Sequence, residues 1–236
     1  MFSFFRKRRR EQLRALPFPP EFERILTANV PSYRRLPAGL RAQLHGHVQV
    51  LLAEKHFEGC NGLEMTDEVR VTIAGEAGLL LLNRETHYYP DLVTILVYPD
   101  IFYADVEDHE GHIVSEYKED RSGESWELGV VILSWKDAVE HASTGRAGYN
   151  VVLHEFAHQL DMENGAMDGM PRLKSRAERD AWIAAFGEAY ERVERGDHRR
   201  SVVDDYGLGD PAEFFAVVTE SFFERRLARV YHRYQG

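Results

Sequence analysis

The sequence predicts an α+β fold, with a mixed sheet in the middle of the chain and helices before and after it. Apolar residues recur at helical spacing near both ends of the chain, whereas short runs rich in Val, Ile and Leu lie between them. A chain of 236 residues, 44% of them hydrophobic, can bury one substantial core. We therefore expect one domain over residues 21–236, preceded by a basic, flexible tail over residues 1–20.

Helices are expected at both ends of this domain. Segments 22–26 and 36–57 have the apolar periodicity of helices, and so does the longer segment 175–196. A last helix is expected to begin at Asp210-Pro211, because an acidic cap followed by proline is typical of a helix N-terminus.

The sheet is expected between these helical regions. Alternating apolar residues indicate a strand that begins at Val69, and segment 74–82 fits either a short buried helix or another strand. Segments 94–98 and 129–135 are interpreted as strands, and the acidic segment 103–117 could supply an edge strand.

The most informative motif is His154-Glu155-x-x-His158, which lies in an apolar run that Asn164-Gly165 ends. On a helix, residues four apart lie one above the other, so His154 and His158 can bind one metal ion from the same face. Glu155 is placed to take a proton from a water on that metal. These residue types at this spacing predict a zinc hydrolase with an active-site helix.

Two polar neighbours of the motif have two interpretations each. Asn150 shares the helix stripe of His154 and His158, and it either starts the helix or faces a pocket. Asp161 either orients a histidine ring N–H or is a solvated acid near the helix end.

A catalytic zinc site needs a third protein ligand. The metzincin pattern is excluded because Asp161 and Asn164 stand where it requires glycine and histidine. A thermolysin-like spacing points to Glu178, 20 residues after the second histidine, but Glu178 lies in a charge-rich segment typical of a solvated helix surface.

Glu213 is the stronger candidate for the third ligand. It lies in the first turn of an apolar helix, where a buried acid needs a partner such as a metal cation. The alternative is that Asp210 and Glu213 form a capping box and that Glu213 touches no metal. Glu220, on the same helix face, is either an alternate ligand or an acid that supports a ligand.

Several motifs together resemble the Mlc titration factor A family of zinc metallopeptidases. They are Asn150-x-x-x-His154-Glu155-x-Ala157-His158-x-Leu160-Asp161, Tyr206, Asp210-Pro211-Ala212-Glu213-x-Phe215-Ala216-Val217, Glu220 and Phe222-Phe223. Upstream, Val97-Tyr98-Pro99, Gly123-x-Ser125-Trp126 and Val131-Ile132-Leu133-x-Trp135 also match. The resemblance covers about residues 90–224 and is less clear before them.

The resemblance implies a zincin-like catalytic domain of the gluzincin class that holds one zinc ion per chain. It implies that His154, His158 and Glu213 are the ligands, that Glu155 is the general base, and that Tyr206 stabilises the oxyanion. The implied activity is that of an aminopeptidase on short peptides. The alternative is a regulatory protein that binds and titrates a transcriptional repressor, with catalysis secondary or absent.

Charge and composition narrow the remaining classes. The net charge of −10 argues against a nucleic-acid binder, although residues 6–10 form a basic run behind several Phe residues. That run fits a solvated terminus, or a tail that binds a membrane surface or nucleic acid. No signal peptide or transmembrane segment is indicated, and Cys60 is the only cysteine, so we expect the protein in the reducing cytoplasm. We also expect a monomer.

Overall fold

The computed structural model describes residues 2–100, 102–110, 113–121, 123–126, 129–144, 150–195 and 210–226. Four helices come first along the chain: α1 (Phe2–Arg14), α2 (Pro20–Asn29), α3 (Pro31–Arg35) and α4 (Ala38–Glu54). Helix α4 confirms most of the predicted segment 36–57, but it ends at Glu54 because the chain then enters a strand.

Helix α1 corrects the expectation of a flexible N-terminal tail. Residues Phe2–Arg14 are helical, and α1 packs against α4. The Arg10 guanidinium forms a bidentate contact with the Glu54 carboxylate, with N···O distances of 2.9 and 2.7 Å. The periodicity of apolar residues did not reveal this helix because a basic residue, Arg10, makes its contact with the body.

Among the described residues, the main sheet has four strands in the order β1-β2-β6-β5. Its members are β1 (His56–Gly59), β2 (Thr94–Tyr98), β5 (Gly123–Trp126) and β6 (Val130–Ser134). Strands β1, β2 and β6 run parallel and β5 is antiparallel to β6, so the sheet is mixed, as predicted. Both β2 and β6 match the predicted strands because runs of buried Val, Ile and Leu mark them.

The strand predicted from Val69 is wrong. Residues Asp67–Leu79 form helix α5, which is capped by the Thr66 side chain. Nearly every residue from Val69 to Leu79 is buried, so apolar residues occupy all faces of this helix and two-residue alternation carries no information.

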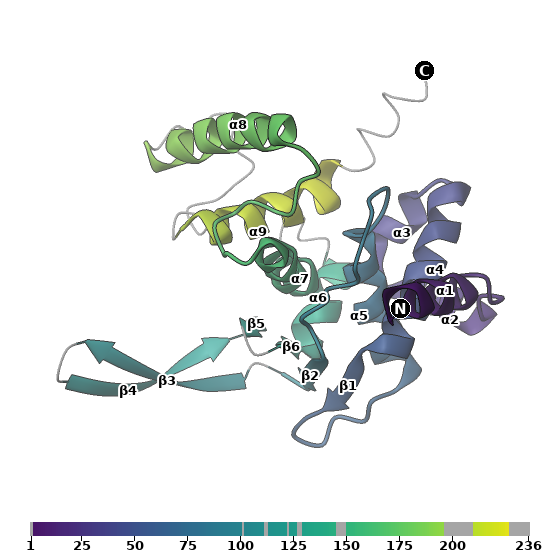
Figure 1. Cartoon of the computed structure of the whole chain (residues 1–236). Helices are drawn as coiled ribbons and strands as arrows, with labels where there is room; N and C mark the ends of the chain where they lie inside the picture. Colours follow the sequence, from purple (N-terminus) through teal and green to yellow (C-terminus); the bar gives the residue numbers. More distant parts are fainter. Residues whose placement is uncertain are drawn as a thin grey trace.

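The acidic segment after residue 102 forms a separate two-stranded ribbon. Strands β3 (Phe102–Glu110) and β4 (Ile113–Arg121) pair antiparallel with each other. In Figure 1 this ribbon extends away from the helices, and it is not a strand of the main sheet.

Helices dominate the C-terminal part. They are α6 (Trp135–Thr144), α7 (Val151–Asp161), η1 (Met162–Asn164), α8 (Arg176–Glu194), α9 (Pro211–Ser221) and η4 (Phe222–Arg226). Helix α7 lies between the sheet and α9, with α8 beyond α9 (Figure 1). The predicted helices at 175–196 and from Asp210 are confirmed as α8 and α9.

Helix α7 is held by the main hydrophobic core. Its Val152, Leu153 and Phe156 side chains are fully buried. The ring of Phe156 packs edge-on against Tyr89, with 4.9 Å between ring centroids. Because these residues face the core, the histidines of α7 are turned to the side where α9 lies.

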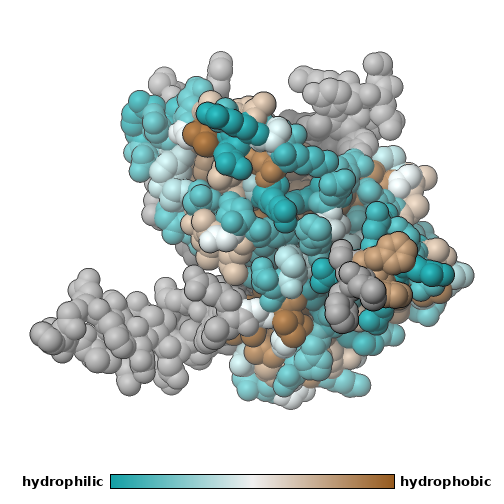
Figure 2. Space-filling model, viewed as in Figure 1, coloured by the Kyte–Doolittle hydropathy of each residue, from teal (hydrophilic) through white to brown (hydrophobic). Residues whose placement is uncertain are grey.

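The surface shows no continuous apolar band on the face drawn in Figure 2, where hydrophobic colour occurs in separate spots among hydrophilic residues. Among the described residues, no helix is long and apolar enough to cross a bilayer.

A buried histidine in α4 makes stability depend on pH. His47 is 2% exposed, and its Nδ1 lies 3.0 Å from the Tyr88 hydroxyl. Burial lowers the pKa of His47 to about 4, with a smaller effect of Arg14 in the same direction.

We predict that His47 contributes stability above pH 6.5 that is lost as the pH falls toward 4. As the pH falls, the His47 ring takes up a proton in the unfolded chain, where its pKa is about 6.5, before it does so in the folded protein. Acid therefore favours unfolding by roughly 3 kcal/mol. Chemical denaturation at pH 7 and pH 4.5 measures it. Between pH 7 and pH 4.5, His47→Gln is expected to lose less stability than wild type does. The exposed control His56→Gln is expected to lose as much as wild type. Equal slopes in all three proteins would contradict the assignment.

Candidate metal centre

Helix α7 presents two imidazoles on one face. Asn150 caps the helix by accepting a hydrogen bond from the Leu153 N–H at 3.0 Å, which supports its interpretation as the helix start. One turn later His154 and His158 lie side by side, and their Nε2 atoms are 3.2 Å apart. The predicted helical placement of the two histidines is therefore confirmed.

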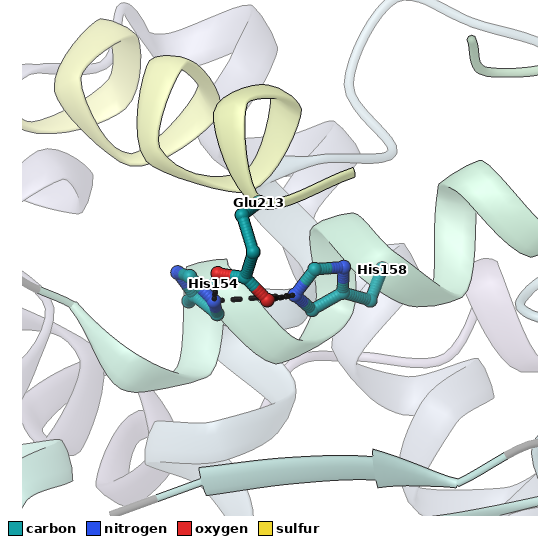
Figure 3. A group of neighbouring side chains, drawn as sticks. All are labelled: His154, His158 and Glu213. Atoms are coloured by element: carbon teal, nitrogen blue, oxygen red, sulfur yellow. Dashed lines mark hydrogen bonds and ion pairs between the residues drawn. The ribbon is translucent and has the colours of Figure 1, made fainter. Parts of the chain in front are cut away.

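Glu213 reaches these imidazoles from α9. The Asp210 carboxylate caps α9 by accepting hydrogen bonds from Ala212 N–H and Glu213 N–H, at 2.8 and 2.9 Å. The Glu213 side chain points down to α7, with one carboxylate oxygen 3.3 Å from His154 Nε2 and the other 3.3 Å from His158 Nε2 (Figure 3). The carboxylate that could have served only as a cap thus faces the histidine pair.

The three side chains have the spacing of ligands around one small cation. Ligands held tetrahedrally at about 2.0–2.1 Å from zinc lie roughly 3.3 Å from one another. The separations of 3.2, 3.3 and 3.3 Å among His154, His158 and Glu213 match that edge length. Two imidazoles and a carboxylate are also a donor set that zinc accepts.

The electrostatics of the trio favour a positive charge at its centre. Burial disfavours the charged ring of His154, but hydrogen bonds to Glu213 and Glu220 outweigh burial and raise its pKa to about 10. Hydrogen bonds from His154 and His158 hold the pKa of Glu213 well below its ordinary value. A divalent cation would satisfy the same carboxylate.

Glu220 acts on the other side of His154. Its carboxylate lies 2.6 Å from Nδ1, the ring nitrogen that faces away from Glu213. The Asn150 backbone N–H donates to Glu220 at 3.3 Å, and the Asn150 amide donates to Glu224 at 3.2 Å. Glu220 is therefore placed to hold the orientation and tautomer of His154 rather than to join the three converging ligand atoms.

Glu155 is buried beside the trio, with 6% of its surface exposed. Burial raises its pKa to about 7, against the opposing effect of His154 and His158. A carboxylate in this pKa range can exchange a proton near neutral pH.

Two other acids have structural roles. The Asp161 carboxylate accepts a hydrogen bond from the Gly169 N–H at 2.9 Å, so it holds the loop after α7 and is not a solvated acid. Glu178 accepts from the Lys174 N–H at 2.7 Å, while Ser175 accepts from the Glu178 N–H. Glu178 thus holds the start of α8 together with Ser175, which removes it from the candidate ligands.

Tyr206, the predicted oxyanion donor, lies outside the described residues. Of the two acids behind His154, the sequence pointed to Glu220 but not to Glu224. The two lie four residues apart in an apolar helical segment, and this spacing could have shown that they share one face.

The comparisons with known proteins identify the family of this chain. The family model described as glucose-regulated metallo-peptidase M90 matches residues 4–232. The chain belongs to this family. It is similar to the uncharacterized protein slr2042 of Synechocystis sp., with 41% identity over 92% of this chain and 80% of the relative.

Other relatives of this M90 chain carry the name Mlc titration factor A. The protein of Salmonella agona is 30% identical over 82% of this chain and 74% of its own length. The protein of Serratia proteamaculans is 31% identical over 73% of this chain and 67% of its own length.

We predict that Glu220→Gln weakens metal binding at the trio about 10- to 100-fold, the usual effect of removing an acid that supports a metal-binding histidine. The variant keeps the side-chain volume but loses the charge next to His154 Nδ1. Competition with a chelator measures the affinity. The exposed Glu191→Gln on α8 is the matched control and should bind zinc like wild type; an equal affinity of both variants would contradict the role of Glu220.

Gly169 fixes the approach of α9 to α7. Its φ is +76°, and a Cβ there would lie 2.5 Å from the Pro211 carbonyl oxygen at the start of α9. Gly165 has a comparable φ of +94° but open space around the Cβ position.

We therefore predict that Gly169→Ala destabilises the protein more than Gly165→Ala does. Both substitutions carry backbone strain of roughly 1 kcal/mol or more, and only the first adds a backbone clash. Denaturant unfolding measures the difference, and equal losses would show that the contact with Pro211 has no cost.

Proposed function

We propose that this protein is a zinc-dependent peptidase in which His154, His158 and Glu213 bind the metal. The observation that carries the proposal is the convergence of three ligand atoms at the separations of a tetrahedral zinc site. Membership of a metallo-peptidase family supports the reaction class.

Zinc, when bound, supplies a water of lowered pKa and polarises the scissile carbonyl. Glu155 would be the base that takes a proton from a water at this site and the acid that gives it to the leaving amine. Its burial and its pKa of about 7 support both halves of this transfer. Glu220 keeps the His154 ring in place from behind, and Tyr206 donates to the oxyanion in the proposed scheme.

An extended peptide is the substrate form that we propose. A strand before α7, within residues 129–135 or just upstream, would dock it by edge pairing. Strand β6 is an interior strand, whereas β5, just upstream of it, lies at the sheet edge and next to α7. Backbone pairing along β5 would bring a peptide bond toward the metal. In line with the family resemblance, we propose aminopeptidase action on short peptides.

The central test is Glu155→Gln. We expect hydrolysis of short peptides by the zinc-loaded enzyme to fall roughly 10²–10⁴-fold, because proton transfer is lost. Zinc content, measured by mass spectrometry of the native protein, should stay at one per chain. Glu191→Gln should retain full activity. Undiminished turnover in Glu155→Gln would remove this residue from the mechanism. Aminopeptidase specificity is tested separately, by comparing peptide substrates with free and with acetylated N-termini.

A second candidate function comes from the relatives named Mlc titration factor A. We propose it as the alternative: this protein binds a transcriptional repressor and withdraws it from DNA. A pulldown with a repressor of the Mlc type discriminates the two. Capture by both wild type and Glu155→Gln would support titration independent of catalysis, and absence of capture would exclude that partner.

A further inference from the structure

Helix α1 is fixed to the body by one side only. Arg10 binds the Glu54 carboxylate, donates to the His87 carbonyl oxygen at 3.0 Å, and lies 4.6 Å from the centre of the Tyr88 ring. Leu13, on the same side of the helix as Arg10, packs against the main core. The orientation of α1 on the surface is therefore set.

The opposite side of α1 exposes two aromatic rings. Phe4 is 67% exposed and Phe5 is 61% exposed, among the highest values for the large hydrophobic side chains that the structure describes. Arg8 and Arg9 follow them by one helical turn, so each ring has a cation beside it. At 100° per residue, Phe4 and Arg8 lie nearly opposite the side that Arg10 and Leu13 fix.

The charge of this helix is opposite to that of the whole protein. Helix α1 carries six basic residues and one acidic residue, whereas the chain has a net charge of −10. Arg10 is paired with Glu54, but among the described residues no ion pair involves Arg6, Lys7, Arg8 or Arg9. These four cations are exposed on a helix end that also exposes Phe.

We propose that α1 is a docking helix that binds the anionic surface of a lipid bilayer. Phe4 and Phe5 insert at the level of the headgroups, and the neighbouring basic side chains contact lipid phosphates. With 13 residues, the helix is about 20 Å long and lies in the interface without crossing it.

A lipid surface fits these features better than a nucleic acid does. Phosphates of either ligand would attract the basic residues, but only a bilayer gives two exposed Phe side chains an apolar environment. Membrane binding through α1 is independent of the metal trio, so its failure would leave the proposed peptidase activity untouched.

The experiment is sedimentation of the full chain with vesicles of phosphatidylglycerol and phosphatidylcholine, compared with phosphatidylcholine alone. We expect binding to the anionic vesicles and little to the neutral ones. Arg8→Gln/Arg9→Gln should lower the partition coefficient about 30-fold, since each basic residue near the surface contributes roughly fivefold. Phe4→Ser/Phe5→Ser should lower it at least about tenfold.

Matched controls lie on α8, where Arg176→Gln/Arg179→Gln and Ile183→Ser change exposed residues of the same kinds; all should bind like wild type. Circular dichroism checks that each variant folds. Three results would overturn the proposal: no vesicle binding, equal binding to neutral and anionic vesicles, or losses equal to those of the controls. If duplex DNA displaces the protein fully from the vesicles, and Phe4→Ser/Phe5→Ser still binds the vesicles like wild type, α1 would be assigned to nucleic acid instead.

Discussion

The meeting of the Glu213 carboxylate with the imidazoles of His154 and His158 is the constraint on which the site depends. It joins α9 to α7 across a long stretch of sequence, and both oxygens of the carboxylate take part. The contact requires α9 to start at a fixed place. The Asp210 cap and the close approach of Gly169 to Pro211 provide that start. In the proposed zinc site, metal binding would be coupled to folding because the three side chains come from separately packed helices.

A buried polar network supports this contact from behind. Glu220 holds His154, and Asn150 both caps α7 and donates to Glu220 and Glu224. Acids this deeply buried destabilise the fold unless they have partners. The Asn150 amide and the His154 imidazole are these partners, and the acids in turn orient the imidazole. One asparagine thus connects the start of α7 to the acids of α9 and η4.

Apolar periodicity and capping residues predicted the helices and strands that they mark. They failed for a helix that is buried on all of its faces. Strands β2 and β6 and helices α7, α8 and α9 were found because their apolar runs and caps are distinctive. Helix α5 was mistaken for a strand because apolar residues occupy all of its faces. The docked helix α1 was missed because its contact is the ion pair of Arg10 with Glu54, a partner 44 residues away.

The sequence by itself determined that His154 and His158 share a helix face and that Glu155 lies between them, because helical spacing is a local property. It also identified Glu213 as a candidate and left Glu178, Glu220 and a simple cap as alternatives. Only the tertiary structure decided among these. Which carboxylate meets the imidazoles, and from which side, depends on how α9 packs on α7, and packing between distant segments leaves no periodic signal in the chain.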